Sequence, residues 1–162
     1  MAIVDYFLKI DGIDGESADH KHKSEIQLES WSFGATQSGT MAYGGGGGAG
    51  KVQMQDFNFT MRANKASPKL FLACATGEHI KKAVLVCRKA GKDQQEFLKY
   101  TFSDCLVSSW QTSGSGGSDI IPVESISLNF AKIEQEYKEQ KSDGTLGGSI
   151  QAGYDLKLGK KV

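Results

Sequence analysis

The 162-residue sequence has no excess of charge of either sign. Lysine and arginine together number 19, aspartate and glutamate also number 19, and the formal net charge is therefore zero. A balanced chain carries no overall basic field that would attract nucleic acid or an anionic membrane. Neutrality also weakens the repulsion between copies of the chain. We expect no nucleic-acid partner, and self-association is favoured.

Cysteine is scarce, and long apolar runs are missing. The three cysteines, Cys74, Cys87 and Cys105, cannot all pair and show no Cys-x-x-Cys spacing, so we expect buried, reduced thiols. No stretch approaches the eighteen or so apolar residues of a membrane span, which predicts no membrane insertion. The segment Met1 to Tyr6 lacks the features of a secretory signal peptide. We therefore expect synthesis in the cytoplasm without a signal peptide, and any export by a route that accepts folded protein.

The most distinctive feature present is a glycine run, Gly44 to Gly50, with six glycines in seven residues. Ordering so many glycines costs much conformational entropy, so we expect the run to become ordered only against a partner. Residues 45–51 formally match the phosphate-binding pattern G-x-x-x-x-G-K. That motif needs Ser or Thr next and then a helix, whereas Val52 follows here and residues 52–61 alternate as in a strand. We favour a docking loop, with a nucleotide-binding enzyme as the alternative.

The apolar pattern predicts a mainly β protein that forms a single domain over residues 1–162. Strand patterns lie at residues 4–10, 25–34, 52–61, 83–87, 96–110, 123–137 and 154–158. In the segments 25–34, 52–61 and 123–137 the apolar residues change phase midway, as at a bulge or bend. Long bent strands are typical of two packed sheets or a barrel.

One helix is predicted at about residues 67–77. Ser67 is the expected N-cap, Pro68 the first helical residue and Gly77 the residue just past the end. Its apolar face is expected to contain Leu70, Phe71 and Cys74, and to plug one end of the barrel.

No catalytic, metal or cofactor site is predicted. His20 and His22 lie in a charged loop without a third ligand at a recognisable spacing, so we expect both to be solvated. His79 follows the predicted helix, where its imidazolium would interact favourably with the helix dipole. Ser32 lacks the G-x-S-x-G pattern of a nucleophile and a convincing base. Acids in turns or on polar strand faces, such as Asp11 and Asp14, are expected to be merely solvated.

Several motifs occur in a specific order and spacing along nearly the whole chain. They are Ile10-Asp11-Gly12-Ile13-Asp14-Gly15-Glu16-Ser17, Trp31-Ser32-Phe33-Gly34, the glycine run with Gly50-Lys51-Val52, Ser67-Pro68-Lys69-Leu70 with Cys74, Arg88-Lys89-Ala90-Gly91, Leu106-Val107-Ser108-Ser109, Ser113-Gly114-Ser115-Gly116-Gly117 and Leu128-Asn129-Phe130. Together they resemble the Hcp family, the hemolysin-coregulated tube proteins of bacterial type VI secretion.

The resemblance implies two packed antiparallel sheets forming a β-barrel, with one short α-helix and an extended glycine-rich loop at about residues 37–55. It also implies hexameric rings that stack into a tube, which is propelled out with a spike from inside a contractile sheath. Small effector proteins would travel in the lumen. An alternative that we keep open is a monomeric ligand-binding barrel.

Candidate site residues follow from the same resemblance. Ser32 is expected on a strand that lines the tube, as a contact for cargo. The extended loop is expected to form an assembly arm that reaches a neighbouring subunit or ring. Its expected anchors are Met41, Tyr43 and Val52, and its pliable tip contains Gly44, Gly46, Gly48 and Gly50.

Overall fold

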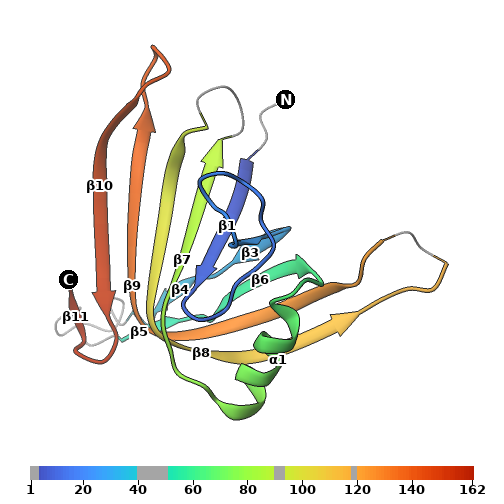
Figure 1. The fold of residues 1–162 in the computed structure, drawn as a ribbon. Coiled ribbons are helices and arrows are strands. Elements are labelled where there is room, and N and C mark those ends of the chain that lie inside the picture. The colour runs from blue at the N-terminus through green and yellow to red at the C-terminus, as the bar shows by residue number, and fades with distance from the viewer. Residues whose placement is uncertain (1–3, 40–50, 90–93, 118–119) are drawn as a thin grey trace.

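The computed structural model describes residues 4–39, 51–89, 94–117 and 120–162 (Figure 1). These residues form strands β1 (Val4–Ile10), β2 (Ile26–Gln27), β3 (Ser30–Ser32), β4 (Ala35–Gln37), β5 (Val52–Met54) and β6 (Phe57–Arg62), helix α1 (Ser67–Thr76), and strands β7 (Ile80–Lys89), β8 (Glu96–Ser113), β9 (Val123–Gln140), β10 (Leu146–Asp155) and β11 (Lys160–Lys161). The predicted mainly β fold with one helix is confirmed. Within the described ranges, α1 is too short to cross a membrane.

Two long strands, β8 and β9, organise the fold because each belongs to two sheets. The first part of β8 pairs with β7 and with the last part of β9, which also pairs with β10. Strand β7 pairs in turn with β1, and we call this set of strands the wide sheet. The last part of β8 pairs with the first part of β9. This part of β9 also pairs with β6, and β6 pairs with β3; we call this set of strands the narrow sheet. Between Leu128 and Lys132, β9 exchanges β6 for β10 as its partner. The predicted change of phase in residues 123–137 is therefore a bend between two sheets (Figure 1).

The two sheets enclose a common core because one segment crosses between them. The backbone N–H of Leu28 donates to the Tyr6 carbonyl of β1 at 2.9 Å, and the next N–H, of Glu29, donates to the Thr60 carbonyl of β6, also at 2.9 Å. Strand pairings thus run from β1 through this crossing to β6, β9, β8, β7 and back to β1. This circuit agrees with the predicted barrel, and it explains the predicted change of phase in residues 25–34.

Aromatic side chains fill the space between the two sheets. Phe57, Phe59 and Phe102 are fully buried, and the rings of Phe57 and Phe102 lie 4.6 Å apart between their centroids. Trp31 packs at the margin of this cluster, 5.5 Å from the ring of Tyr100. Each such buried ring contributes about 1.5–3 kcal/mol of stability relative to an exposed one. The core therefore holds the bends of β8 and β9 in place.

Helix α1 packs against β8 at one end of the barrel, but two details of its prediction are wrong (Figure 1). The N-cap is Ala66, and Ser67 is already helical, because the side chain of Asn64 accepts the Ala66 N–H at 2.8 Å. Phe71 is 52% exposed and does not belong to the buried face, which contains Leu70 and Ala73. Gly77 ends the helix with φ of 65°, as predicted.

A second correction concerns the C-terminal region. Residues 154–158 were predicted to be a short strand after a loose, glycine-containing stretch. Instead β10 begins at Leu146 and ends at Asp155, and a turn follows. The strand includes Gly147 and Gly148 because β10 pairs along its length with β9. Nonlocal hydrogen bonding thus overrides a local preference against strand.

The loop between β1 and β2 is anchored on the outer side of the wide sheet. Arg88 of β7, only 2% exposed, donates to both carboxylate oxygens of Asp19 and more weakly to Asp5. In the same loop His22 is buried, contrary to its prediction. Its ring stacks on Phe7 at 4.4 Å, and its Nδ1 lies 3.0 Å from the Glu25 carboxylate. His20 is exposed, as predicted.

Candidate functional site

Ser32 is exposed at the end of β3, on the outer side of the narrow sheet. Residues directly opposite each other on paired strands point to the same side of a sheet, so the pairing register shows its neighbours. Two rungs cross β3, β6, β9 and β8 in order. They are Ser32, Asn58, Ser127 and Ser109, and then Ser30, Thr60, Ser125 and Gln111. We call these residues the hydroxyl face; all are hydroxyl or amide side chains, and none carries a charge.

Side chains of the hydroxyl face bond to one another. The hydroxyls of Ser30 and Thr60 lie 2.6 Å apart. Ser127 Oγ lies 2.7 Å from Ser108 Oγ and 2.6 Å from Ser109 Oγ. Both serines reach the same partner because the register of β8 shifts between Val107 and Ser109, as at a β-bulge. The bulge therefore adds a hydroxyl to this surface.

Among the residues that the structure describes, the charged groups next to the hydroxyl face lie at its margins, and each has a polar partner. At one margin the Asp56 carboxylate accepts hydrogen bonds from Ser108 Oγ at 2.6 Å and Asn129 Nδ2 at 2.9 Å. At the other margin Arg62 Nε lies 2.9 Å from Glu29 Oε1. An exposed pair of this kind is screened and contributes about 0–1 kcal/mol. The two rungs themselves are uncharged, whereas Asp56 keeps a carboxylate with neutral partners at one margin.

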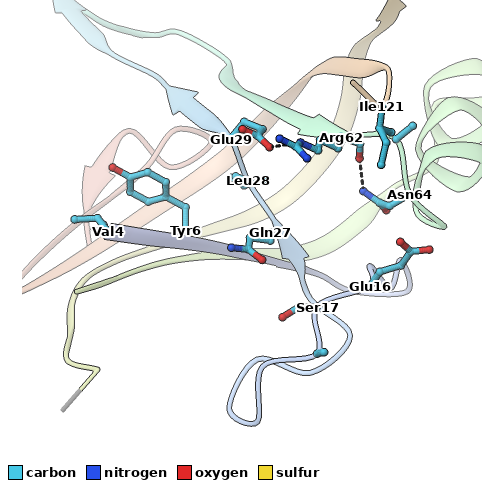
Figure 2. A pocket seen from close by; sticks show the side chains of 12 residues that line it. Val4, Tyr6, Glu16, Ser17, Gln27, Leu28, Glu29, Arg62, Asn64 and Ile121 are labelled. Atoms are coloured by element: carbon cyan, nitrogen blue, oxygen red, sulfur yellow. Dashed lines mark hydrogen bonds and ion pairs between the residues drawn. The ribbon is translucent and has the colours of Figure 1, made fainter. Parts of the chain in front are cut away.

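A hollow of about 530 Å³ adjoins the Glu29–Arg62 margin (Figure 2). Its lining includes Val4 and Tyr6 of β1, Leu28 and Ile121. Figure 2 shows the Glu29–Arg62 pair on its rim and Asn64 donating to the Arg62 carbonyl at 2.8 Å. The carboxylates of the lining belong to Glu16 and Glu29, and that of Glu29 is held by Arg62.

Strands β4 and β5 flank the predicted assembly arm and form a hairpin base for it. Strands β4 and β5 form a separate two-stranded sheet in which Gln37 lies opposite Val52. The Lys51 N–H donates to Ser38 Oγ at 3.3 Å, one step further along the arm. Val52 is therefore placed at the base and is half-buried. The other proposed arm residues lie outside the described residues: Met41, Tyr43, Gly44, Gly46, Gly48 and Gly50.

Local structure disfavours the phosphate-binding alternative. The residues after Lys51 form strand β5, as predicted, so no helix N-terminus directly follows the glycine run to stabilise an anion. The described part of the chain contains no group of three histidine, cysteine or acidic side chains able to hold a metal ion. His79 is exposed and lies 3.0 Å from Asp104 Oδ1. Its environment is thus that of an exposed, hydrogen-bonded surface residue.

Two of the three thiols are poorly suited to nucleophilic chemistry. Cys87 and Cys105 are buried, as predicted, whereas Cys74 is partly exposed. Burial raises the pKa of both Cys87 and Cys105 to about 12, because the apolar surroundings disfavour the thiolate. Neither thiol is a competent nucleophile at neutral pH.

The sequence analysis named Ser32 but none of the residues that surround it on this face. The polar phases of β6 and β9 do carry the signal, since Asn58, Thr60, Ser125 and Ser127 alternate with buried apolar residues. Alternation shows that these residues share a side of their own strand. Only the pairing of β3, β6, β9 and β8 shows that they form one surface.

Comparisons with known proteins identify relatives of this architecture. Residues 7–137 match the family model described as "Type VI secretion system effector, Hcp". Protein hcp1 of Pseudomonas aeruginosa is 46% identical over 156 residues, which cover 95% of this chain and 96% of the relative. The crystal structure of Hcp1 from Salmonella typhimurium has a TM-score of 0.82 and 42% identity, with all of both chains covered. A structure of a type six secretion system protein has a TM-score of 0.92 and 35% identity, covering 99% of this chain and 100% of that one.

Proposed function

This chain belongs to the Hcp family of type VI secretion proteins, and we propose that it is the structural subunit of the secretion tube. Copies assemble into hexameric rings, and the rings stack into a hollow tube. The tube works with the spike and sheath of the apparatus, leaves the cell by the type VI route and carries small effector proteins. The role is structural, not enzymatic.

The hydroxyl face is the observation that carries the lumen part of this proposal. It includes Ser32, spans four strands and presents two rungs without a charge. A conduit must hold its cargo and still release it. Neutral side chains that already bond to one another contribute only about 0.5–1.5 kcal/mol per exchanged hydrogen bond. The hydroxyl face therefore offers many weak contacts and no strong electrostatic one.

The arm supports the assembly part of the proposal. A head-to-tail contact uses different patches on each subunit and closes into a ring when the rotation divides the circle. Among the described residues, β4 and β5 pair only with each other, so this hairpin base is separate from the circuit of strands. A segment of this kind can reach the next ring without altering the barrel. Balanced charge also permits close packing of identical copies.

Sizing tests the proposal directly. Size-exclusion chromatography with light scattering, from micromolar to near-millimolar protein, should show a species of six times the 17.5 kDa chain mass. Electron microscopy of the same sample should show rings with an open centre. A monomer at every concentration would contradict the tube and favour a monomeric ligand-binding barrel.

A further inference from the structure

Residues 11–25 join β1 to β2 and fold back over the outer side of the wide sheet, and we call them the covering loop (Figure 1). The two limbs of this loop are bonded to each other. The Gly15 N–H donates to the Ser24 carbonyl at 2.8 Å, and the Ser24 N–H donates to the Ser17 carbonyl at 2.9 Å. The loop therefore has a shape of its own, and side chains decide how firmly it is held on the sheet.

Two side chains of the covering loop fasten it to the sheet. The first is Asp19, whose carboxylate is bonded to Arg88 of β7. The second is His22, whose ring stacks on Phe7 of β1 with an angle of 7° between the two planes. Aspartate and arginine side chains in general keep their charge near neutral pH, whereas histidine changes its charge between pH 5 and 8. The attachment through His22 is therefore the one that can respond to pH in that range.

Both ring nitrogens of His22 face a carboxylate. Nδ1 lies 3.0 Å from each oxygen of Glu25, in the same loop, and Nε2 lies 3.4 Å from Oε1 of Glu96, at the start of β8. A ring with a proton on each nitrogen donates to both carboxylates at once. A neutral ring carries a single proton, so its other nitrogen directs a lone pair at a carboxylate. The geometry thus matches the imidazolium form at both nitrogens and each neutral tautomer at only one.

The two carboxylates do not hold the ring equally. The Glu25 side chain is only 14% exposed and offers both of its oxygens, whereas the Glu96 side chain is 43% exposed and its contact is longer. A neutral ring is therefore best satisfied with its proton on Nδ1, facing Glu25, and its lone pair on Nε2. The contact with Glu96 is then the one that depends on the charge of the ring, and it is also the one that joins the loop to β8.

Other charged side chains surround the ring on this side of the sheet. They are Asp5 and Lys9 of β1, Arg88 of β7, Glu96 and Lys99 of β8, and Asp19, Lys21, Lys23 and Glu25 of the loop itself. Within the described part of the chain, Glu25 and Glu96 are the only carboxylates within 4.0 Å of the His22 ring nitrogens. A change in the charge of the ring therefore acts first on these two contacts.

We propose that His22 is a pH-sensitive latch, a contact that holds the covering loop on β8 only while the ring is charged. Towards pH 5 the imidazolium bridges Glu25 and Glu96. Towards pH 8 the proton on Nε2 is lost to solvent, a lone pair faces the Glu96 carboxylate, and the loop loosens at this contact while Asp19 and Arg88 still retain it. The latch lies within one subunit and acts independently of the proposed tube function.

Amide hydrogen exchange of the whole chain tests the latch. Between pH 5.5 and 8, after correction for the intrinsic exchange rate, protection of the His22, Ser24 and Glu25 amides should fall about threefold to tenfold, because one partly screened charged contact is lost. Glu96→Gln should remove this dependence, because its amide N–H can donate to the neutral Nε2. The matched control Glu78→Gln, an exposed change just after α1, should behave like wild type.

Nitrogen chemical shifts of the His22 ring, followed over the same pH range, give a second readout. The ring should carry a proton on both nitrogens at pH 5.5 and on Nδ1 alone at pH 8, with the exposed His20 of the same loop as the internal control. Protection that does not follow the His22 titration, or that changes equally in Glu96→Gln, would overturn the latch. A neutral ring with its proton on Nε2 would do the same, because it would still donate to Glu96. None of these outcomes bears on ring assembly, which light scattering measures separately.

Discussion

The guanidinium of Arg88 donates a hydrogen bond to each oxygen of the Asp19 carboxylate, with N–O distances of 3.0 and 2.7 Å. These hydrogen bonds join β7 to the loop that covers its outer side. They also hold the pKa of Asp19 well below its usual range, and the backbone N–H groups of Lys21 and His22 act in the same direction. A buried arginine and a loop carboxylate thus fix a segment that has little regular structure of its own.

The Asp19–Arg88 pair should make stability depend on acid pH. The unfolded carboxyl has a pKa of about 3.9, and the folded pKa is lower. The contribution is therefore complete above the unfolded pKa and is lost as the pH falls towards the folded pKa. Asp19→Asn should lower the free energy of unfolding at pH 7 and reduce its decline between pH 5 and pH 3, measured by urea unfolding. Asp14→Asn, an exposed change in the same loop, is the control. Equal pH dependence in all three proteins would show that the pair is not responsible.

Gly15 should tolerate no side chain. A Cβ at this position would lie 2.6 Å from the Glu25 carbonyl oxygen and 2.8 Å from the Ile26 Cα, and both are backbone atoms of the adjoining segment. Gly15→Ala should therefore destabilise the protein by about 1–3 kcal/mol, as overpacking does. Gly116→Ala is the matched control, because a Cβ there meets nothing within 4 Å. Chemical denaturation of the two variants beside wild type measures the difference, and equal midpoints would refute the close approach.

Thiol labelling should distinguish the three cysteines. With both buried thiols held near a pKa of 12, only the partly exposed Cys74 should react with a maleimide at pH 7.5 under native conditions. Mass spectrometry should show one adduct on the native protein and three after denaturation. The Cys74→Ser variant is the control and should remain unlabelled until it unfolds. Rapid labelling of that native variant would mean that Cys87 or Cys105 is accessible.

Charging the hydroxyl face should alter cargo handling without altering assembly. Ser32→Glu puts a carboxylate at the exposed end of a neutral rung, so rings should form as in wild type. Retention of a co-expressed type VI effector should become sensitive to salt, because exposed charges are screened over about 8–10 Å at 0.1–0.15 M salt. Pull-downs at 50 and 500 mM salt measure this, with Ser115→Glu in an exposed loop as the control. Unchanged retention at both salt concentrations would remove Ser32 from the cargo surface.

Stiffening the arm should weaken the stacking of rings. Proline at Gly46 and Gly48 would restrict the backbone of the glycine run without changing the barrel. Single rings should still form, whereas tubes seen by electron microscopy should become shorter or vanish. The same double substitution with alanine is a milder comparison, because alanine restricts the chain less. Normal tubes from the proline variant would exclude the arm from stacking.

Local patterns predicted much of the fold. Alternation of apolar residues located most strands, and glycine and proline marked the limits of α1 to within a residue or two. The strand after Lys51 was also predicted correctly, because Val52 begins an alternating run of apolar and polar residues. That strand argued against a phosphate-binding site at the glycine run. These features depend on residues that are close in sequence, and local sterics and periodicity determine them.

Other features depended on residues far apart in the chain, and local patterns misjudged them. His22 was expected in solvent, but Phe7 and Glu25 bury it through a loop that folds back on β1. Phe71 was expected in the core, but it is 52% exposed and packs on Trp110 of β8, with 5.2 Å between the ring centroids. Strand β10 forms through two glycines because β9 extends to meet it. In each case a partner distant in sequence decided the outcome.

The sequence by itself therefore determined the class of the fold, the position of the helix and the neutral, hydroxyl-rich character of certain strand faces. Only the tertiary structure decided that Ser32, Asn58, Ser127 and Ser109 lie in one row, and that the row from Cys87 to Ile150 runs from the core to the exposed part of β10. The physical reason is that a strand's period of two fixes which residues share a side. Which strands become neighbours, and which side remains uncovered, is set by hydrogen bonds between distant segments.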